Sequence, residues 1–305
     1  MELRSSILKV VAYFDLFNYP VSIEDILFFL DKEAAEYPVR KEIEALLNQG
    51  CLFRTGSYFS LHNDPALAEK RNWGRQHAEE LLPIAGRGAH FLFQFPFVRG
   101  VCISGSLSKR CADQNADIDY FIITRGNRLW IARTLLHLFK KLTYLRGRQH
   151  RYCMNYFVDE EAMEIKEKNI FTATELITLM PASGNGGLAK FFQANNWTSN
   201  YYPKYGYRSR EAPGTPKPSL LKRCLEQLLD NRLGDRLDDY LRRLTASRWK
   251  QKEQRGELNI KGNVMTLQCG KHYSRPNPEI FQQKVLNKFH RKVKELTDQW
   301  GTMIS

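Results

Sequence analysis

The chain has 305 residues, of which 43% are hydrophobic and 26% are charged. These values are typical of globular proteins, so they exclude a disordered or fibrous chain, and the length predicts two or three domains. The N-terminus has no basic stretch followed by an apolar one, and no apolar run reaches the ~18 residues of a membrane span. We therefore expect a cytoplasmic protein that does not enter a membrane.

The formal net charge of +13 is unevenly distributed. Residues 1–65 contain six Lys/Arg and ten Asp/Glu, a balance of −4, whereas residues 66–305 contain 40 and 23, a balance of +17. A basic surface attracts ligands that carry phosphate. We expect the anionic partner, a nucleoside triphosphate (NTP) or a nucleic acid, to bind outside the N-terminal segment.

Three helices and a hairpin are predicted within residues 1–65 by helical spacing, capping residues and turn residues. They are a helix over 5–17, a helix that begins at Ser22 with Asp25 in a capping box, a helix over 38–48, and a hairpin of 51–53 with 58–61. This order resembles a winged helix-turn-helix. We interpret residues 1–65 as a winged-helix-like domain.

Winged helices commonly bind DNA, but the charge of this segment argues against that use. The third helix carries Arg40 and Lys41 beside Glu42 and Glu44. A surface that binds a duplex needs Lys and Arg to contact phosphates. We expect residues 1–65 to pack against the rest of the chain or to recognise a partner, and not to bind DNA.

Residues 66–202 are interpreted as a second domain of the α+β class, with a small mixed sheet and helices on one side of it. The predicted elements are a helix over 66–95, strands over 98–104 and 117–124, a helix over 127–145, a strand over 152–158 and a helix over 160–180. Residues 203–305 form a basic C-terminal region. It is predicted to hold a linker over 203–217, helical segments through 247, and a last helix from Asn277-Pro278.

The segment 101–124 reads VCISGSLSKRCADQNADIDYFIIT, and its polar residues are those of a phosphate and metal site. Side chains alternate along a strand, so Asp117 and Asp119 are expected on one face. Two carboxylates suit Mg²⁺, or Mn²⁺ in its place, because such an ion takes one or two protein carboxylates together with phosphate oxygens.

Phosphate binding is expected at the turn that precedes these carboxylates. Gly105 lets the backbone approach a phosphate closely, and Ser106 adds a hydroxyl donor. Ser108, Lys109 and Arg110 follow in the same loop and complete the predicted phosphate-binding set, with the two basic residues neutralising triphosphate charge.

The segment consists of an apolar strand, then Gly-Ser, then about ten residues, and then Asp-x-Asp within a second apolar strand. This pattern resembles that of the nucleotidyltransferase superfamily. That superfamily includes DNA polymerase beta, CCA-adding enzymes, aminoglycoside nucleotidyltransferases and the minimal nucleotidyltransferases of toxin–antitoxin pairs. The resemblance implies transfer of a nucleoside monophosphate from an NTP to an unidentified acceptor, which is a small molecule, a protein or RNA. It also implies that Asp117 and Asp119 hold Mg²⁺.

Many members place a third carboxylate on a later strand, where it helps to deprotonate the acceptor. Here the strand over 151–159 has Asn155 in the expected place and Asp159 at its end, so Asp159 is the candidate third catalytic residue. Two alternatives remain. The charge balance of +17 outside residues 1–65 favours addition of nucleotides to RNA. The missing acid in the middle of the strand, together with the winged-helix-like segment, favours a degenerate nucleotide-binding or DNA-binding regulator.

Overall fold

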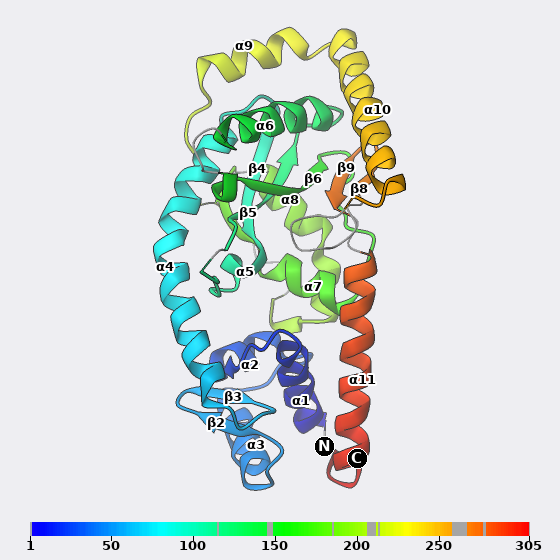
Figure 1. Cartoon of the computed structure of the whole chain (residues 1–305). Coiled ribbons are helices and arrows are strands. Elements are labelled where there is room, and N and C mark those ends of the chain that lie inside the picture. Colours follow the sequence, from blue (N-terminus) through cyan, green and yellow to red (C-terminus); the bar gives the residue numbers. More distant parts are fainter. Residues whose placement is uncertain are drawn as a thin grey trace.

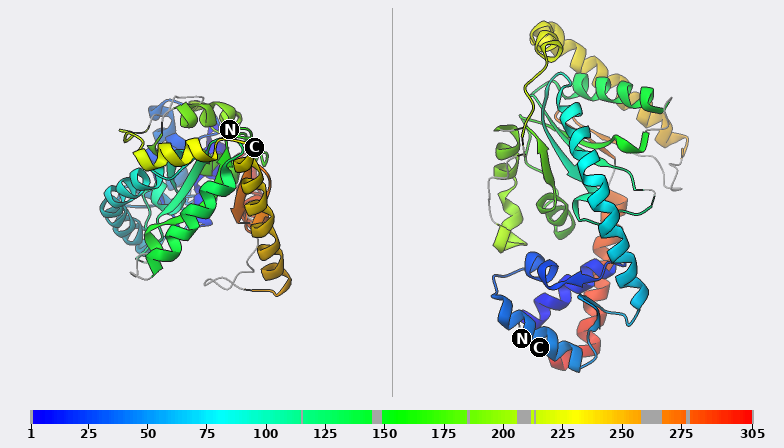
Figure 2. Two further views of the ribbon diagram at one scale, coloured as in Figure 1. Left: turned by 90° about the horizontal axis from the view of Figure 1, so that it is seen from above. Right: turned by 90° about the vertical axis from the view of Figure 1, so that its left-hand side faces the viewer.

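The computed structural model of the chain describes residues 2–114, 116–144, 149–184, 186–205, 212, 214–257, 267–276 and 279–304. It combines helices with two sheets, so the expected α+β class is confirmed. Figures 1 and 2 show an elongated molecule in which residues 2–60, named here the N-terminal module, lie at one end. Two long helices, α4 (Pro65–Phe93) and α11 (Glu279–Ile304), run along opposite sides of the molecule.

The N-terminal module contains the predicted helices and hairpin. Its elements are α1 (Glu2–Asp15), β1 (Val21–Ser22), α2 (Ile23–Phe29), α3 (Glu36–Asn48), β2 (Phe53–Thr55) and β3 (Tyr58–Ser60). The capping box is confirmed, since the Ser22 hydroxyl accepts the Asp25 N–H at 3.2 Å and the Asp25 carboxylate accepts the Ser22 N–H at 3.0 Å. The short strand β1 was not predicted and joins the hairpin in a three-stranded sheet of order β1-β3-β2.

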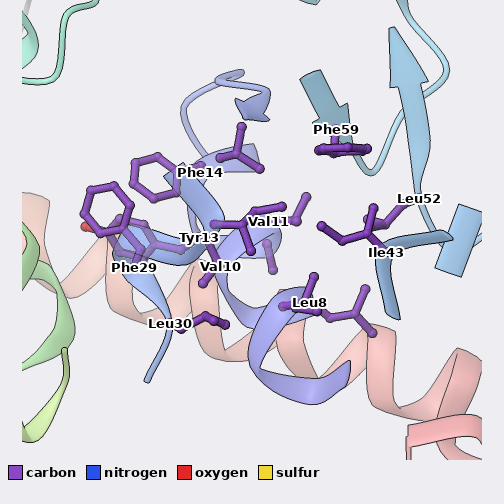
Figure 3. Close-up of a cluster of buried hydrophobic side chains, with 14 of the residues drawn as sticks. Leu8, Val10, Val11, Tyr13, Phe14, Phe29, Leu30, Ile43, Leu52 and Phe59 are labelled. Carbon is purple, nitrogen blue, oxygen red and sulfur yellow. The ribbon is translucent and has the colours of Figure 1, made fainter. Parts of the chain in front are cut away.

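The core of the N-terminal module is built around the apolar face of α1. Figure 3 shows this face between α2 on one side and α3 with the hairpin on the other; the labelled side chains are Leu8, Val10, Val11, Tyr13, Phe14, Phe29, Leu30, Ile43, Leu52 and Phe59. The same core contains Val285, Phe289 and Leu296 of α11. The module therefore does not close its core with residues 1–65 alone.

A six-stranded mixed sheet forms the middle of the molecule. Its strands are β4 (Val98–Ser104), β5 (Asp119–Thr124), β6 (Cys153–Asp159), β7 (Met180–Ser183), β8 (Leu267–Cys269) and β9 (Tyr273–Pro276). Their order is β7-β4-β5-β6-β9-β8, with β5 and β6 parallel and the other neighbours antiparallel. The strands β8 and β9 correct the expectation that residues 203–305 are helical, because a segment of this region pairs with β6.

Helices cover both faces of this sheet, so the expectation of helices on one side is wrong. On one face α4 and α6 (Leu129–Tyr144) cover Tyr120 and Ile122, and on the other α7 (Ile170–Ile177) and α8 (Gly186–Ala194) cover Phe121 and Ile123. The physical reason lies in β5. Its apolar residues are consecutive instead of alternating, as in strands that are buried on two sides.

Two predicted helices have different bounds in the structure. The segment over 160–180 contains only α7, which is followed by β7. The helical segment through 247 is divided into α9 (Leu220–Leu229) and α10 (Arg232–Gln254), because Asn231 accepts N–H groups at the start of α10 and begins a new helix. Residues 277–278, the expected start of the last helix, lie outside the described residues. No described helix is both long and apolar enough to span a membrane.

The first turn of α6 is held by a buried carboxylate of α10. Asp238 is 5% exposed, and its Oδ1 accepts the Ile131 N–H at 2.9 Å. Burial raises the pKa of Asp238 to about 6, against backbone hydrogen bonds from Ile131 and Trp130 that lower it. The contact joins α10 to α6, one of the helices that cover the sheet.

Gly88→Ala is expected to destabilise the protein by about 1–3 kcal/mol, because a methyl group would overpack the contact between α4 and β5. A Cβ at Gly88 would lie 2.3 Å from the Tyr120 hydroxyl oxygen. Urea unfolding of the whole chain measures the change. The control is Gly86→Ala in the same helix, where no described atom lies within 4 Å and alanine should be neutral or stabilising. Equal effects of the two substitutions would contradict the packing.

Asp238→Asn tests the raised pKa. The folded-state pKa of about 6 lies above the value of roughly 4 for an unfolded chain, so the stability that protonation of Asp238 contributes is complete below pH 4 and is lost as the pH rises through 6. Relative to the asparagine variant, the wild type should lose about 3 kcal/mol of unfolding free energy between pH 4 and 7. A difference that does not change with pH would refute this.

Candidate active site

A glycine turn and a carboxylate are in direct contact at the end of β4. The strand ends at Ser104, which pairs with Asp119, and the chain turns into the short helix α5 (Gly105–Ser108). Gly105 has φ +70°, and a Cβ on it would lie 2.5 Å from Oδ2 of Asp119. Glycine is therefore required both for the backbone conformation and for the approach to the carboxylate.

Asp117 and Asp119 lie at the same end of β5, beside the start of β6. Asp119 is the first residue of the strand, and its Oδ1 accepts the Asn155 side-chain N–H at 2.6 Å. Asp117 precedes the strand, and its Oδ1 lies 2.6 Å from Nδ1 of His150. Each carboxylate is thus oriented by a side chain from the segment 149–159. Asn155 occupies the position expected from the sequence.

The thiol of Cys153 lies near both carboxylates. Burial raises the pKa of this thiol to about 11, and the charges of Asp119 and Asp117 both add to the increase, whereas Lys140 opposes it. The charges of both carboxylates therefore reach the start of β6, which agrees with their place at the same end of β5.

The predicted phosphate-binding residues divide into two groups. Ser106 and Lys109 line a cavity beside the turn, and the Lys109 ammonium contacts the Gly105 carbonyl oxygen at 3.1 Å and Glu175 at 2.9 Å. Ser108 instead donates its hydroxyl to the Gly105 carbonyl at 2.9 Å, and Arg110 pairs with Glu79 on α4 at 2.9 Å. Ser108 therefore stabilises the turn, while Arg110 fixes the loop that follows it.

Asp159 lies at the opposite end of the sheet from this site. It pairs with Thr124, whereas Asp119 pairs with Cys153, and five residue steps along a strand span about 17 Å. Asp159 is fully buried, accepts the backbone N–H groups of Asn127 and Glu161, and contacts His272. The structure does not bring it to Asp119, because side chains on one face of a strand need not lie at the same end.

The donor set fits Mg²⁺ or Mn²⁺ only when a triphosphate supplies further ligands. Among the described residues there is no group of three or more His, Cys, Asp or Glu side chains that could hold a metal. Mg²⁺ usually binds through one or two carboxylates together with waters and substrate phosphates. Asp117 and Asp119 are the two carboxylates that this end of the sheet offers to such an ion. The missing side chain of Gly105 lets the Asp119 carboxylate lie directly against the turn.

A cavity of about 410 Å³ adjoins the turn and reaches the N-terminal module. Gly105, Ser106 and Lys109 form its wall on one side, and we name it the turn cavity. Arg71 of α4 lines it and binds the loop beyond the turn, donating to the Arg110 carbonyl at 2.7 Å. Arg71 and His150 were not predicted from the sequence, because their partners lie 39 and 33 residues away and no sequence spacing marks them.

Asn155→Asp is expected to destabilise the protein in EDTA by about 1–4 kcal/mol, because it places a third negative charge against Asp119. Mg²⁺ should reverse most of the loss, since a divalent ion neutralises the added charge. Melting temperatures with EDTA and with Mg²⁺ measure both effects. Asn155→Ala is the control that removes the hydrogen bond without adding charge. An identical response of the two variants to Mg²⁺ would exclude a cation at this position.

The chain matches no protein-family model, no curated protein and no solved structure.

Proposed function

We propose that this protein is a nucleotidyltransferase that moves a nucleoside monophosphate from an NTP to an acceptor, with Mg²⁺ or Mn²⁺. One observation carries the proposal, namely the close approach of Gly105 to Asp119, where a Cβ on the glycine would lie only 2.5 Å from the carboxylate oxygen. It supports a single site in which a phosphate at the turn adjoins the carboxylates. The resemblance of the motif to known nucleotidyltransferases supports the same reaction.

The residues of the site have separate tasks in this proposal. Ser106 and the N–H groups of the turn bind the β- and γ-phosphates, and Lys109, held in place by Glu175, supplies positive charge. Asp117 and Asp119 would hold the metal ion, which neutralises phosphate charge when bound. His150 and Asn155 orient these two carboxylates through their hydrogen bonds.

The reaction forms one bond and breaks another at the α-phosphorus. The acceptor oxygen attacks in line, pyrophosphate leaves with the electron pair of the broken P–O bond, and the acceptor proton passes to solvent water. Asp159 lies too far away to take the acceptor proton, and Asn155 faces Asp119 in place of an acid. The site is thus closer to the two-carboxylate members of the superfamily, the minimal and aminoglycoside-type enzymes.

The order of helices and the three-stranded sheet of the N-terminal module support a winged-helix-like architecture. We propose that it serves as a packing and recognition module and not as a DNA reader, because the charge balance of residues 1–65 is −4. Nucleotide addition to RNA is an alternative, and it is supported by the charge balance of +17 in residues 66–305.

A catalytically degenerate nucleotide-binding regulator is the second candidate function. It is favoured by Asn155, because an amide at this position cannot accept a proton from the acceptor as a carboxylate would. The two functions differ in turnover. Both require binding of NTP with Mg²⁺, and only the first releases pyrophosphate.

Asp119→Asn and Asp117→Asn are each expected to reduce transfer by about 100- to 1000-fold, the usual loss when one stabilising group of a transition state is removed. The protein is incubated with each α-labelled NTP, Mg²⁺ and cell extract, and the labelled product is identified by mass. The control is Asp298→Asn on the exposed face of α11. Transfer at the wild-type rate by Asp119→Asn would refute the proposal, and NTP binding without transfer by the wild type would support the regulator.

A further inference from the structure

The turn cavity lies between two parts of the chain that are distant in sequence. Figure 1 shows α5 and α7 at the end of the sheet that faces the N-terminal module. The lining combines the glycine turn with side chains of the module, of α4, of α7 and of α11. Its volume of about 410 Å³ is within the range of small-molecule sites, which is roughly 300–1,000 Å³.

Aromatic rings from three parts of the chain line the cavity. Phe17 and Tyr19 follow α1, Phe171 belongs to α7 and Phe281 to α11. Phe17 is 41% exposed and Phe281 is 55% exposed, which is a large exposure for phenylalanine rings. Exposed rings at the wall of a cavity offer flat apolar surfaces to a flat ligand, and stacking of a base on such a ring contributes about 1–3 kcal/mol.

A buried hydrogen-bond donor lines the same cavity. Arg71 is 7% exposed, and its two terminal nitrogens donate to the Arg110 carbonyl and to the Tyr19 hydroxyl. These bonds hold Arg71 against the module and the loop beyond the turn, and so fix one wall of the cavity.

The cavity is continuous with the proposed phosphate site but not with the place where an acceptor must react. Gly105, Ser106 and Lys109 line it, whereas the described lining includes neither Asp117 nor Asp119. The cavity adjoins the turn directly, so a molecule whose phosphates occupy the turn has this cavity beside it.

We propose that the turn cavity binds the nucleobase of the NTP, so that the N-terminal module forms one wall of the nucleotide site. A nucleobase is flat and stacks on aromatic rings such as those that line the cavity. Lys70 lies exposed at the same lining and adds positive charge. This inference rests on the proposed function, since it assumes that the turn binds phosphates.

The test compares two ligands that share phosphates but not a base. Binding of a non-hydrolysable NTP analogue and of inorganic tripolyphosphate, each with Mg²⁺, is measured by calorimetry on the whole chain. Phe17→Ala and Phe281→Ala should weaken binding of the NTP analogue by about 5- to 150-fold, the equivalent of the stacking energy, and leave tripolyphosphate binding unchanged. Tyr37→Ala, which removes a ring that is 78% exposed on α3, is the control and should change neither.

The outcomes separate this inference from the proposed function. If the wild type binds neither ligand, the phosphate site and with it the proposed function are wrong. If the wild type binds both ligands with equal affinity, or if the two phenylalanine variants keep wild-type affinity for the NTP analogue, only the nucleobase site is overturned. Unchanged NTP affinity with a raised KM for the acceptor would assign the cavity to the acceptor instead.

Discussion

The guanidinium group of Arg71 joins the N-terminal module to the loop that follows the glycine turn. It donates to the Arg110 carbonyl and to the Tyr19 hydroxyl, lies 3.8 Å from the Asp25 carboxylate, and stacks over the Tyr19 ring at 4.0 Å. Tyr19 in turn donates to the Lys109 carbonyl at 3.0 Å. Because the carbonyls belong to the loop between the turn and the carboxylates, the position of this loop depends on the module. A buried cation with these partners is costly to disturb.

The sheet holds the other half of the site. The strand β5 is buried on both faces, so its first residue, Asp119, is fixed relative to the helices on each side. Gly88 allows α4 to approach Tyr120 on one of these faces, and the Tyr120 hydroxyl donates to the Ala85 carbonyl at 3.0 Å. A rigid strand thus presents the carboxylate, while the adjoining turn is held by a separate module. The site depends on the fit between the two.

Local signals in the sequence predicted local structure well. The bounds of β4, the capping box at Ser22 and the turn at Gly105 depend on residues close in sequence, and all three are present in the structure. Partners distant in sequence were not predictable in this way. A period of two residues placed Asp159 on a strand face but gave no information about which end of the sheet it would reach. The strands β8 and β9, with three and four residues, are too short for a periodic signal and owe their existence to pairing with β6.

The packing of α11 in the core of the N-terminal module affects how the protein folds during synthesis. Domains usually fold in the order in which they leave the ribosome. Here Phe289 of α11 packs against Tyr13 of α1 with ring centroids 5.7 Å apart, so the ribosome has to translate the whole main sheet before this contact can form. Until then the nascent module exposes the apolar side of α1 that α11 later covers, and exposed apolar surface of this kind promotes aggregation. The first residues to be made are among the last to reach their final environment.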